Sequence, residues 1–304
     1  MTKQTISQSQ KRASDSLSSL FLPNGSENSE FLFLKSSSDV GVERNGGRNG
    51  ARLAPQSFLS YFKKLNKKIS LEGFKFLEIE VSDEEAERND FHQSQKTETQ
   101  KIASALNHSS EASICHLGGG HDHIYPLLSA LGKRFKKVIV INIDAHADTR
   151  TDTEYHSGTP FRQFASEYQG EFSLYQVGLH EFANSLSTLS PLPNGKSEIL
   201  WKNQLTDSFI RDEFFLSIKG QVDKDSAVVF SLDADALSGH EIPGVSAVNG
   251  NGISREMLSH LWLQYQQLGF THKPIMGIYE LNPVYDSLSM LSMRTLASFV
   301  YETL

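Results

Sequence analysis

The sequence predicts a single α/β domain in which a mostly parallel sheet is covered by helices on both faces. Short β-branched or aromatic runs alternate along the chain with longer stretches of helical periodicity. No linker rich in Pro, Gly or Ser interrupts this alternation after Asn28. We therefore expect one domain over residues 29–304, because domain boundaries fall in such linkers.

The first 28 residues are rich in Ser and contain few apolar side chains. We expect residues 1–28 to form a flexible arm or a surface cap. The N-terminus lacks the apolar run of an export signal, and no apolar run elsewhere reaches membrane-spanning length. The single cysteine, Cys115, excludes an intrachain disulfide. These features predict a cytoplasmic protein with no membrane contact.

Seven segments have the apolar, β-branched composition of strands. They are FLFL at 31–34, FKFLEIE at 74–80, ASICHL at 112–117, KKVIVINI at 136–143, FSLYQVGL at 172–179, SAVVFSLD at 226–233 and PIMGIYEL at 274–281. Several of them are apolar throughout, as expected for strands that are buried on both faces of a parallel sheet.

Helical periodicity separates these strands. Residues 55–69 place Phe58, Phe62, Leu65 and Ile69 on one face, which predicts a covering helix. Further helices are predicted at 254–269, with Ser254 as N-cap and Gly269 as stop, and at 287–304. The polar segment at 82–100 is predicted to be an exposed helical connection.

The charge balance favours a small-molecule partner. The chain has 29 Lys and Arg against 36 Asp and Glu, for a net charge of −7. This balance argues against a basic surface for nucleic acid or an anionic membrane. Small ligands of a parallel sheet bind at the carboxyl ends of its strands, so polar residues at those ends carry the functional information.

Carboxylates and imidazoles gather where three predicted strands end. They are His121 after GGG, then Asp144, His146 and Asp148 in IDAHAD, and Asp233 and Asp235 in SLDAD. Carboxylates this close repel unless a cation lies between them. Two imidazoles and four carboxylates suit a pair of divalent ions, since one ion leaves too much negative charge. The ligand types exclude Cu(I) and iron–sulfur sites without separating Mn²⁺ from Fe²⁺, Co²⁺, Ni²⁺ or Zn²⁺.

The motifs GGGH, DAHAD and SLDADAL, in this order at strand ends, resemble those of the ureohydrolase family of arginases, agmatinases and formimidoylglutamases. The resemblance extends from about Asp39 to the C-terminus. It implies a three-layer α/β/α, arginase-like catalytic domain with two Mn²⁺ per chain. It also implies two ligand sets, namely His121, Asp144, Asp148 and Asp233 for one ion, and Asp144, His146, Asp233 and Asp235 for the other.

Two further residues match catalytic positions of the family. Glu280, after the last predicted strand, stands where the family has a Glu that pairs with the amidinium or guanidinium group of the substrate. His156 stands at the position of a proton-shuttling histidine. Taken alone, each residue is compatible with an ordinary structural role.

The stretches SDVGVERNGGRNGAR, HSGTPFRQ and IPGVSA resemble formimidoylglutamases more than arginases. Arg150 follows DAHADT, where arginases have a neutral Asn, and a guanidinium suits a more acidic substrate tail. The alternative for Arg150 is a surface ion pair with Asp152. Arg44, Arg48 and Arg162 are further candidates for contact with a substrate carboxylate.

The resemblance implies a hydrolase that cleaves the amidine C–N bond of N-formimidoyl-L-glutamate to L-glutamate and formamide, a step of histidine catabolism. One alternative is a guanidino-hydrolase of the same family that releases urea. Another is a non-catalytic metal-binding homologue, although all six ligands, Glu280 and His156 are retained. We expect a homo-oligomer, as is common in the family, that binds a small amidine and neither nucleic acid nor membrane.

Overall fold

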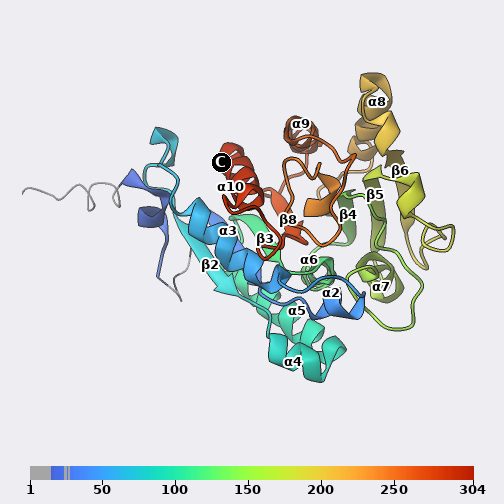
Figure 1. The fold of residues 1–304 in the computed structure, drawn as a ribbon, viewed down its shortest axis with the longest axis horizontal. Coiled ribbons are helices and arrows are strands. Elements are labelled where there is room, and N and C mark those ends of the chain that lie inside the picture. The colour runs from blue at the N-terminus through green and yellow to red at the C-terminus, as the bar shows by residue number, and fades with distance from the viewer. Residues whose placement is uncertain (1–14, 24–25, 27) are drawn as a thin grey trace, which may run out of the picture.

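In the computed structural model, which describes residues 15–23, 26 and 28–304, eight strands form one sheet (Figure 1). The strands are β1 (Phe31–Ser36), β2 (Phe76–Glu80), β3 (Ser113–Gly118), β4 (Lys137–Ile143), β5 (Glu171–Leu179), β6 (Lys196–Trp201), β7 (Ser226–Asp233) and β8 (Ile275–Tyr279). Their order is β2-β1-β3-β8-β7-β4-β5-β6, and every neighbouring pair is parallel. The predicted parallel sheet is confirmed.

All seven predicted strands are present, and the eighth, β6, was not predicted. It lies at an edge of the sheet and pairs with β5 alone. Its first three residues, Lys196, Ser197 and Glu198, are exposed. An edge strand with polar exposed residues lacks the apolar run by which the buried strands are recognised.

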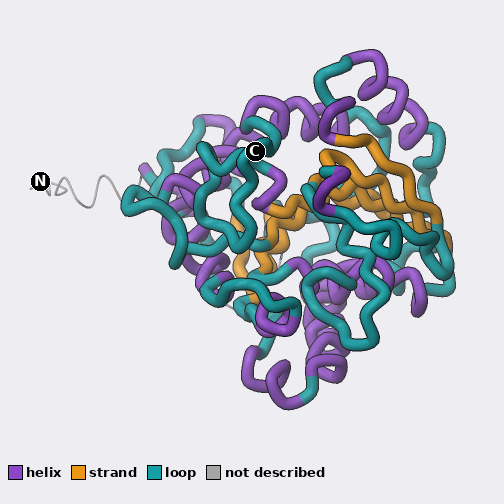
Figure 2. The backbone as a smooth tube through the Cα atoms, turned by 45° about the vertical axis from the view of Figure 1, so that its right-hand side comes forward, coloured by secondary structure: helices purple, strands orange, loops and turns teal. Residues whose placement is uncertain are grey.

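Helices cover both faces of the sheet. One face is covered by α3 (Ala54–Phe62), α8 (Ser208–Lys219), α9 (Arg255–Gln266) and α10 (Leu291–Thr303), and the other by α5 (Phe91–His108), α6 (Ile124–Leu131) and α7 (Pro160–Glu167). Strand residues alternate between the two cores, so that Ile139 and Ile141 face one and Val138 and Val140 the other. Figures 1 and 2 show the resulting layers, which confirm the predicted three-layer fold. None of the described helices is long and apolar enough to cross a membrane.

The predicted helix at 55–69 is too long. Phe58 and Phe62 are fully buried, but α3 ends at Phe62 and Ile69 is 93% exposed. The chain turns after Phe62, where Leu65 donates a backbone hydrogen bond to the Phe62 carbonyl oxygen. The prediction that Ile69 faces the core is therefore wrong, because the helical periodicity does not continue beyond the turn. The helix at 254–269 is confirmed as α9, with Ser254 capping the backbone N–H of Met257.

The polar segment at 82–100 is not an exposed connection. It forms α4 (Glu84–Asn89) and most of α5, and both helices turn charged side chains inward. Glu87 is 2% exposed and Glu98 1% exposed. The helical part of the prediction is confirmed, but the expected exposure is wrong for Glu87 and Glu98, because the sequence does not show the buried imidazole and hydroxyls that donate hydrogen bonds to these carboxylates.

Part of the predicted flexible arm packs against the domain. Leu17 is fully buried, and its backbone N–H donates to the Leu65 carbonyl oxygen at 2.8 Å. The ring of Phe21 stacks on Phe76 with centroids 5.1 Å apart. Two apolar side chains thus hold residues 15–23 against the domain, which agrees with the surface-cap alternative for these residues. Residues 1–14, 24, 25 and 27 lie outside the described residues, so the boundary at residue 28 stays a prediction.

This packing predicts different outcomes for two truncations of apolar side chains. Leu17→Ala should lower the free energy of unfolding by about 2–5 kcal/mol, because it leaves a cavity in the core. Ile69→Ala, at an exposed position, should change it by less than about 0.5 kcal/mol. Urea unfolding of both variants measures the difference, and equal effects would show that residues 15–23 do not pack as described.

Candidate metal centre

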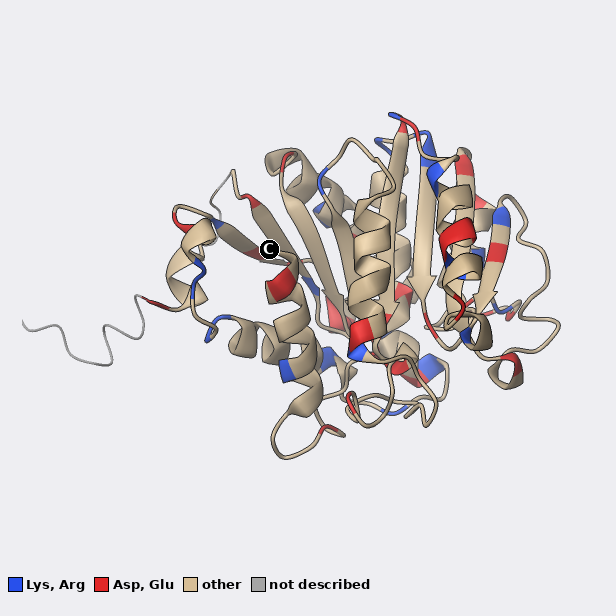
Figure 3. Ribbon diagram, turned by 90° about the horizontal axis from the view of Figure 1, so that it is seen from above, with Lys and Arg blue, Asp and Glu red and all other residues tan. Residues whose placement is uncertain are grey.

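Four neighbouring strands carry polar residues at their carboxyl ends. His121 follows β3, Asp144 follows β4, Asp233 ends β7 and Glu280 follows β8. In the sheet these strands stand in the order β3-β8-β7-β4. Because they are parallel and adjacent, their carboxyl ends meet at one edge. In Figure 3, where Asp and Glu are red, several acidic residues are seen near the ends of strands, among others elsewhere on the molecule.

The turn between β3 and His121 has no room for side chains. A Cβ atom on Gly119 would overlap the carbonyl oxygen of Ser38, and one on Gly120 would overlap the carboxylate of Asp122. Glycine is required here because two backbone segments approach each other closely. This tight turn fixes the position of His121 at the carboxyl edge of the sheet.

The side chain of His121 is held from two sides. Its ring stacks on Tyr279, with centroids 4.8 Å apart, and its Nε2 lies 2.8 Å from Ser231 Oγ. Its backbone N–H donates to Glu280 Oε1 at 3.0 Å. When Nε2–H donates to the hydroxyl of Ser231, Nδ1 carries the lone pair that a metal ligand needs.

Three carboxylates converge on His121 Nδ1. Oδ2 of Asp148 is 3.0 Å away, Oδ2 of Asp233 3.1 Å and Oδ2 of Asp144 3.3 Å. The four ligand atoms of this group lie within 4.8 Å of one another. One nitrogen can donate only one proton and cannot satisfy three carboxylates. A cation between these atoms compensates all three, so the group fits a metal ion.

A second ligand group shares Asp144 with the first. Nδ1 of His146 lies 3.2 Å from Oδ2 of Asp235 and 3.7 Å from Oδ1 of Asp144. Oδ1 of Asp235 is buried and has no hydrogen-bond partner, which also fits a cation. The structure thus brings together all six predicted ligands. It places Asp233 in the first group, so the implied contact of Asp233 with a second ion stays a prediction.

The electrostatics of the centre reflect crowded, buried carboxylates. Burial and neighbouring carboxylates raise the pKa of Asp144 and of Asp233 to about 7. Asp235 raises the pKa of His146 to about 11, against the effect of burial. Burial, followed by repulsion from Asp233, raises the pKa of Glu280 well above its usual range. Positive charge between the carboxylates would relieve this repulsion.

Two residues of the centre have left-handed backbone conformations. Asp148 has φ 51° and Glu280 has φ 62°, and they are two of the four non-glycine residues with positive φ in the described part of the chain. This conformation is unfavourable for residues with a Cβ and persists where the surrounding structure holds it. In this conformation, the side chains of Asp148 and Glu280 both reach the cavity at the carboxyl edge of the sheet.

A cavity of about 690 Å³ opens beside the ligand groups. Its lining includes His146, Asp148, Asp233, Asp235, Glu280 and Arg150. This volume suits a small substrate. The cavity therefore combines the candidate metal ligands with a carboxylate and a guanidinium that can contact a ligand.

Arg150 faces this cavity and is about half exposed. Its Nη1 donates to Asn45 Oδ1 at 2.6 Å and lies 3.8 Å from Asp152 Oδ2. Both interpretations of Arg150 thus have a structural counterpart. Arg48 also lines the cavity, but its guanidinium donates to the carbonyl oxygens of Val245 and Ser246.

The other two candidate arginines are engaged elsewhere. Arg44 pairs with Glu154 at 2.7 Å. Arg162 donates to the carbonyl oxygens of Thr149 and Ser190. Neither lines the cavity, so a direct role in substrate binding has no support for them.

His156 is buried in the loop that follows Asp148. Its Nδ1 accepts a hydrogen bond from the backbone N–H of Gly158, so its Nε2 carries the proton and donates to Asp152 Oδ2 at 2.8 Å. Asp152 lines the cavity, whereas His156 is not part of the lining. The predicted proton shuttle therefore stays a prediction, and it requires a ring nitrogen to become free.

The sequence analysis did not identify Asn184, whose side chain holds the backbone of the DAHAD segment. Its Oδ1 accepts from the backbone N–H of Ala147, and its Nδ2 donates to the carbonyl oxygen of Ala145. It also lines the cavity. A lone Asn in a loop after β5 has no spacing pattern, and only its position after a strand could have indicated it.

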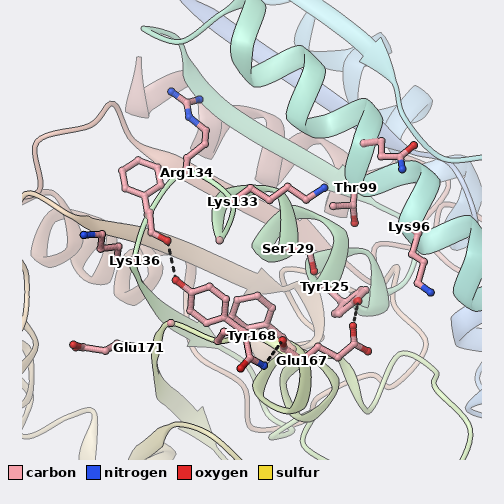
Figure 4. A pocket seen from close by; sticks show the side chains of 16 residues that line it. Lys96, Thr99, Tyr125, Ser129, Lys133, Arg134, Lys136, Glu167, Tyr168 and Glu171 are labelled. Atoms are coloured by element: carbon pink, nitrogen blue, oxygen red, sulfur yellow. Dashed lines mark hydrogen bonds between the residues drawn. The ribbon is translucent and has the colours of Figure 1, made fainter.

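A larger cavity of about 1120 Å³ lies at the opposite edge of the sheet, where β4 and β5 begin (Figure 4). Tyr168 donates there to the Phe135 carbonyl oxygen, and Tyr125 to Glu167. None of the candidate metal ligands lines it. Its tyrosines join helices to the neighbouring chain segments, and the carboxyl edge remains the candidate active site.

Known proteins resemble the chain in sequence and fold. The model of the arginase family matches residues 38–304. A formimidoylglutamase of Photorhabdus laumondii is 27% identical over 254 residues, which cover 82% of this chain and 77% of that protein. The structure of formimidoylglutamase from Bacillus subtilis superposes with a TM-score of 0.80 at 19% identity, covering 94% and 89% of the two chains. Formiminoglutamase of Trypanosoma cruzi, crystallised with Mn²⁺, gives a TM-score of 0.75 at 23% identity, covering 94% and 96%.

The fold and the two strand-end ligand groups define an α/β/α protein built around a site for paired divalent ions. The chain belongs to the arginase family. The family resemblance predicted from the three motifs is thereby confirmed.

Removal of divalent ions should destabilise the protein more at pH 8 than at pH 6. The folded-state pKa of Asp144 and Asp233 is raised to about 7. Between about pH 4 and pH 7, these two carboxyl groups are therefore protonated in the metal-free folded state and ionised in the unfolded state. The free energy of unfolding of the metal-free protein falls as the pH rises through this range. Metal binds the deprotonated ligands, so the stabilisation by added Mn²⁺ should grow by about 1.4 kcal/mol per pH unit for each displaced proton.

Thermal unfolding after chelation, with and without added Mn²⁺ at both pH values, measures this effect. Asp144→Asn removes the carboxylate that both groups share, and as a control it should weaken the response to Mn²⁺. An equal gain from Mn²⁺ at pH 6 and pH 8 in the unmodified protein would contradict the competition between protons and metal.

Proposed function

We propose that the protein hydrolyses N-formimidoyl-L-glutamate to L-glutamate and formamide. Water adds to the amidine carbon, the bond from this carbon to the glutamate nitrogen breaks, and the leaving amine takes up a proton. The observation that carries the proposal is the cavity that is lined by members of both ligand groups together with Glu280 and Arg150. The formimidoylglutamases among the relatives support the choice of substrate.

The residues present fit two divalent ions, which we propose to be Mn²⁺. His121, Asp144, Asp148 and Asp233 would hold one, and Asp144, His146 and Asp235 the other, with Asp233 as a further ligand. When bound, such ions lower the pKa of water and so make a nucleophile available near neutral pH. The oxygen-rich donor set, with one imidazole in each group, is compatible with Mn²⁺.

Glu280 would bind the amidinium group. Its Oε1 accepts from the His121 backbone, which fixes the carboxylate beside the first ligand group. A planar cation can form two parallel hydrogen bonds with such a carboxylate. A cationic substrate next to Glu280 also favours its ionised form, against the effect of burial.

Arg150 would bind a carboxylate of the substrate tail. Half of its side chain is exposed at the cavity, and Asn45 orients its guanidinium. N-formimidoyl-L-glutamate carries two carboxylates, whereas arginine carries one and agmatine none. A guanidinium at this place therefore favours the more acidic substrate.

We further propose that the enzyme acts in histidine catabolism in the cytoplasm, as a homo-oligomer. The product glutamate and the single buried thiol of Cys115 support the first two points. Phe209 and Leu216 on α8 and Leu263 on α9 are exposed apolar side chains, which supports association. Size-exclusion chromatography with light scattering measures the oligomeric state.

Purified, Mn²⁺-loaded protein should release formamide from N-formimidoyl-L-glutamate and no urea from arginine, agmatine or guanidino acids. Urea release without formamide would assign the protein to the guanidino-hydrolases. Bound metal with no turnover on any of these substrates would instead indicate a non-catalytic homologue.

Asp233→Ala should lower kcat/KM by at least about 10³-fold, because metal-ion catalysis contributes several kcal/mol of transition-state stabilisation. Asp225→Ala is the matched control, since Asp225 is exposed and lies at the opposite end of β7. Steady-state kinetics on the formimidoyl substrate measures both. Full activity of Asp233→Ala would exclude Asp233 as an essential ligand.

Arg150→Ala should lower kcat/KM for formimidoyl-glutamate by about one to two powers of ten, since a charge-assisted contact contributes about 1.5–3 kcal/mol. Arg150→Asn should reduce the preference for the dicarboxylate over a monocarboxylate analogue, because it keeps a donor and removes the charge. If Arg150 only pairs with Asp152, both variants should change kcat/KM little.

His156→Ala should lower kcat by about 10²-fold or more, as expected for loss of a general acid. Asp152→Asn removes the charge that holds the ring and leaves the imidazole in place, so it should reduce kcat less. Measurement of kcat against pH for both variants separates the roles. Equal losses with an unchanged pH profile would mean that the Asp152–His156 pair only supports the loop.

A further inference from the structure

A second cluster of ionisable side chains lies outside the candidate metal centre at the strand ends, which is called the strand-end centre below. It consists of Glu87 on α4 with Asp122 and His123, which follow His121 in a 3₁₀ helix. One ligand atom of each of the three lies within 4.8 Å of the others. All three residues are at most 2% exposed, and none belongs to the ligand groups described above.

The orientation of His123 is typical of a metal ligand. Its Nδ1 lies 3.0 Å from Glu98 Oε2, and the Glu98 carboxylate also accepts the hydroxyl of Ser36. An ionised carboxylate only accepts, so Nδ1 carries a proton and the lone pair of the neutral ring is on Nε2. Metal-binding histidines commonly donate their other N–H to a carboxylate in this way.

Two hydrogen-bond acceptors lie near His123 Nε2. The carbonyl oxygen of Ser38 lies 3.2 Å away and Oδ2 of Asp122 4.0 Å away. A lone pair on Nε2 has no donor here, whereas a cation would be attracted by the nitrogen and both oxygens. The alternative is a doubly protonated His123 that donates to Ser38.

Both carboxylates of the cluster have unsatisfied oxygens. Oε1 of Glu87 and Oδ1 of Asp122 are buried without a hydrogen-bond partner. The other oxygen of Glu87 accepts a hydrogen bond from the hydroxyl of Ser38. Unsatisfied buried carboxylate oxygens are costly, and a divalent cation would neutralise both charges at once.

We propose that Glu87, Asp122 and His123 form a separate site for a single divalent cation of hard or borderline character, with the carbonyl oxygen of Ser38 as a further donor. One imidazole among oxygen ligands suits Mn²⁺ and its first-row neighbours. The ion ties α4 to the chain before α2 (Val40–Arg44) and to the turn that carries His121. Its role is structural and is independent of the substrate.

A proton could replace the cation. Burial raises the pKa of Glu87 to about 8, so a neutral Glu87 is the competing explanation. Glu87→Gln separates the two, because an amide resembles a protonated carboxyl group but does not supply the charge that holds an ion. If a proton occupies the site, this variant should keep both its metal content and its stability.

The test measures bound metal in the full chain after Mn²⁺ loading and gel filtration. Elemental analysis should find one ion per chain fewer in Glu87→Gln than in the unmodified protein. The electron paramagnetic resonance spectrum of an isolated Mn²⁺ should disappear, while the spectrum of the coupled pair at the strand-end centre remains. Glu85→Gln, at an exposed position of the same helix, should change neither.

Equal metal content in Glu87→Gln and the unmodified protein would overturn the proposal, as would the absence of an isolated Mn²⁺ signal in the unmodified protein. Asp122→Asn provides a second variant with the same expected loss, should Glu87→Gln not fold. Formamide release by the unmodified protein is measured separately. Failure of the proposed hydrolysis is therefore distinguishable from failure of this site.

Discussion

The convergence of three carboxylates on His121, two of them buried, is the constraint on which the site and much of the fold depend. Carboxylates repel in a buried place, and only a rigid frame can hold them together until a cation compensates them. The adjacent parallel strands β3, β8, β7 and β4 provide this frame, because their carboxyl ends cannot separate without breaking the sheet. Burial, followed by repulsion from neighbouring carboxylates, raises the pKa of Asp144 and of Asp233 to about 7, so the ionised forms are unfavourable here without a cation.

This frame of parallel strands explains which parts of the structure can be predicted from the sequence. Buried strands must be apolar on both faces, and the ligands at their ends must follow at fixed positions, so both features appear as patterns along the chain. The edge strand β6 and the end of α3 are decided by exposure and by a local turn, which leave no such pattern. Leu17 was missed because a single buried side chain can anchor a segment whose average composition is polar.

The loops around the cavity were less predictable than the ligands. The six candidate ligands follow strand ends whose positions are fixed by the sheet, and the structure brings them together in two groups that share Asp144. Arg150 contacts Asn45, and His156 contacts Asp152. These residues lie in or beside loops, where the sequence has no periodic pattern from which such contacts can be predicted. The burial of Glu87 and Glu98 was not predicted either, because their hydrogen-bond partners lie on other elements, far away in the sequence.

The turn after β3 connects the two clusters of ionisable groups. His121 faces the strand-end centre, while Asp122 and His123 face α4 and α5, so three consecutive residues contribute to two different polar environments. The glycines before them exclude any side chain that could separate the turn from Ser38. A change in the Glu87 cluster can therefore reach the ligand geometry through one short backbone segment, with His121 held on its far side by Tyr279 and Ser231. Through this connection, an ion at the proposed Glu87 site would help to fix the position of the candidate ligand His121.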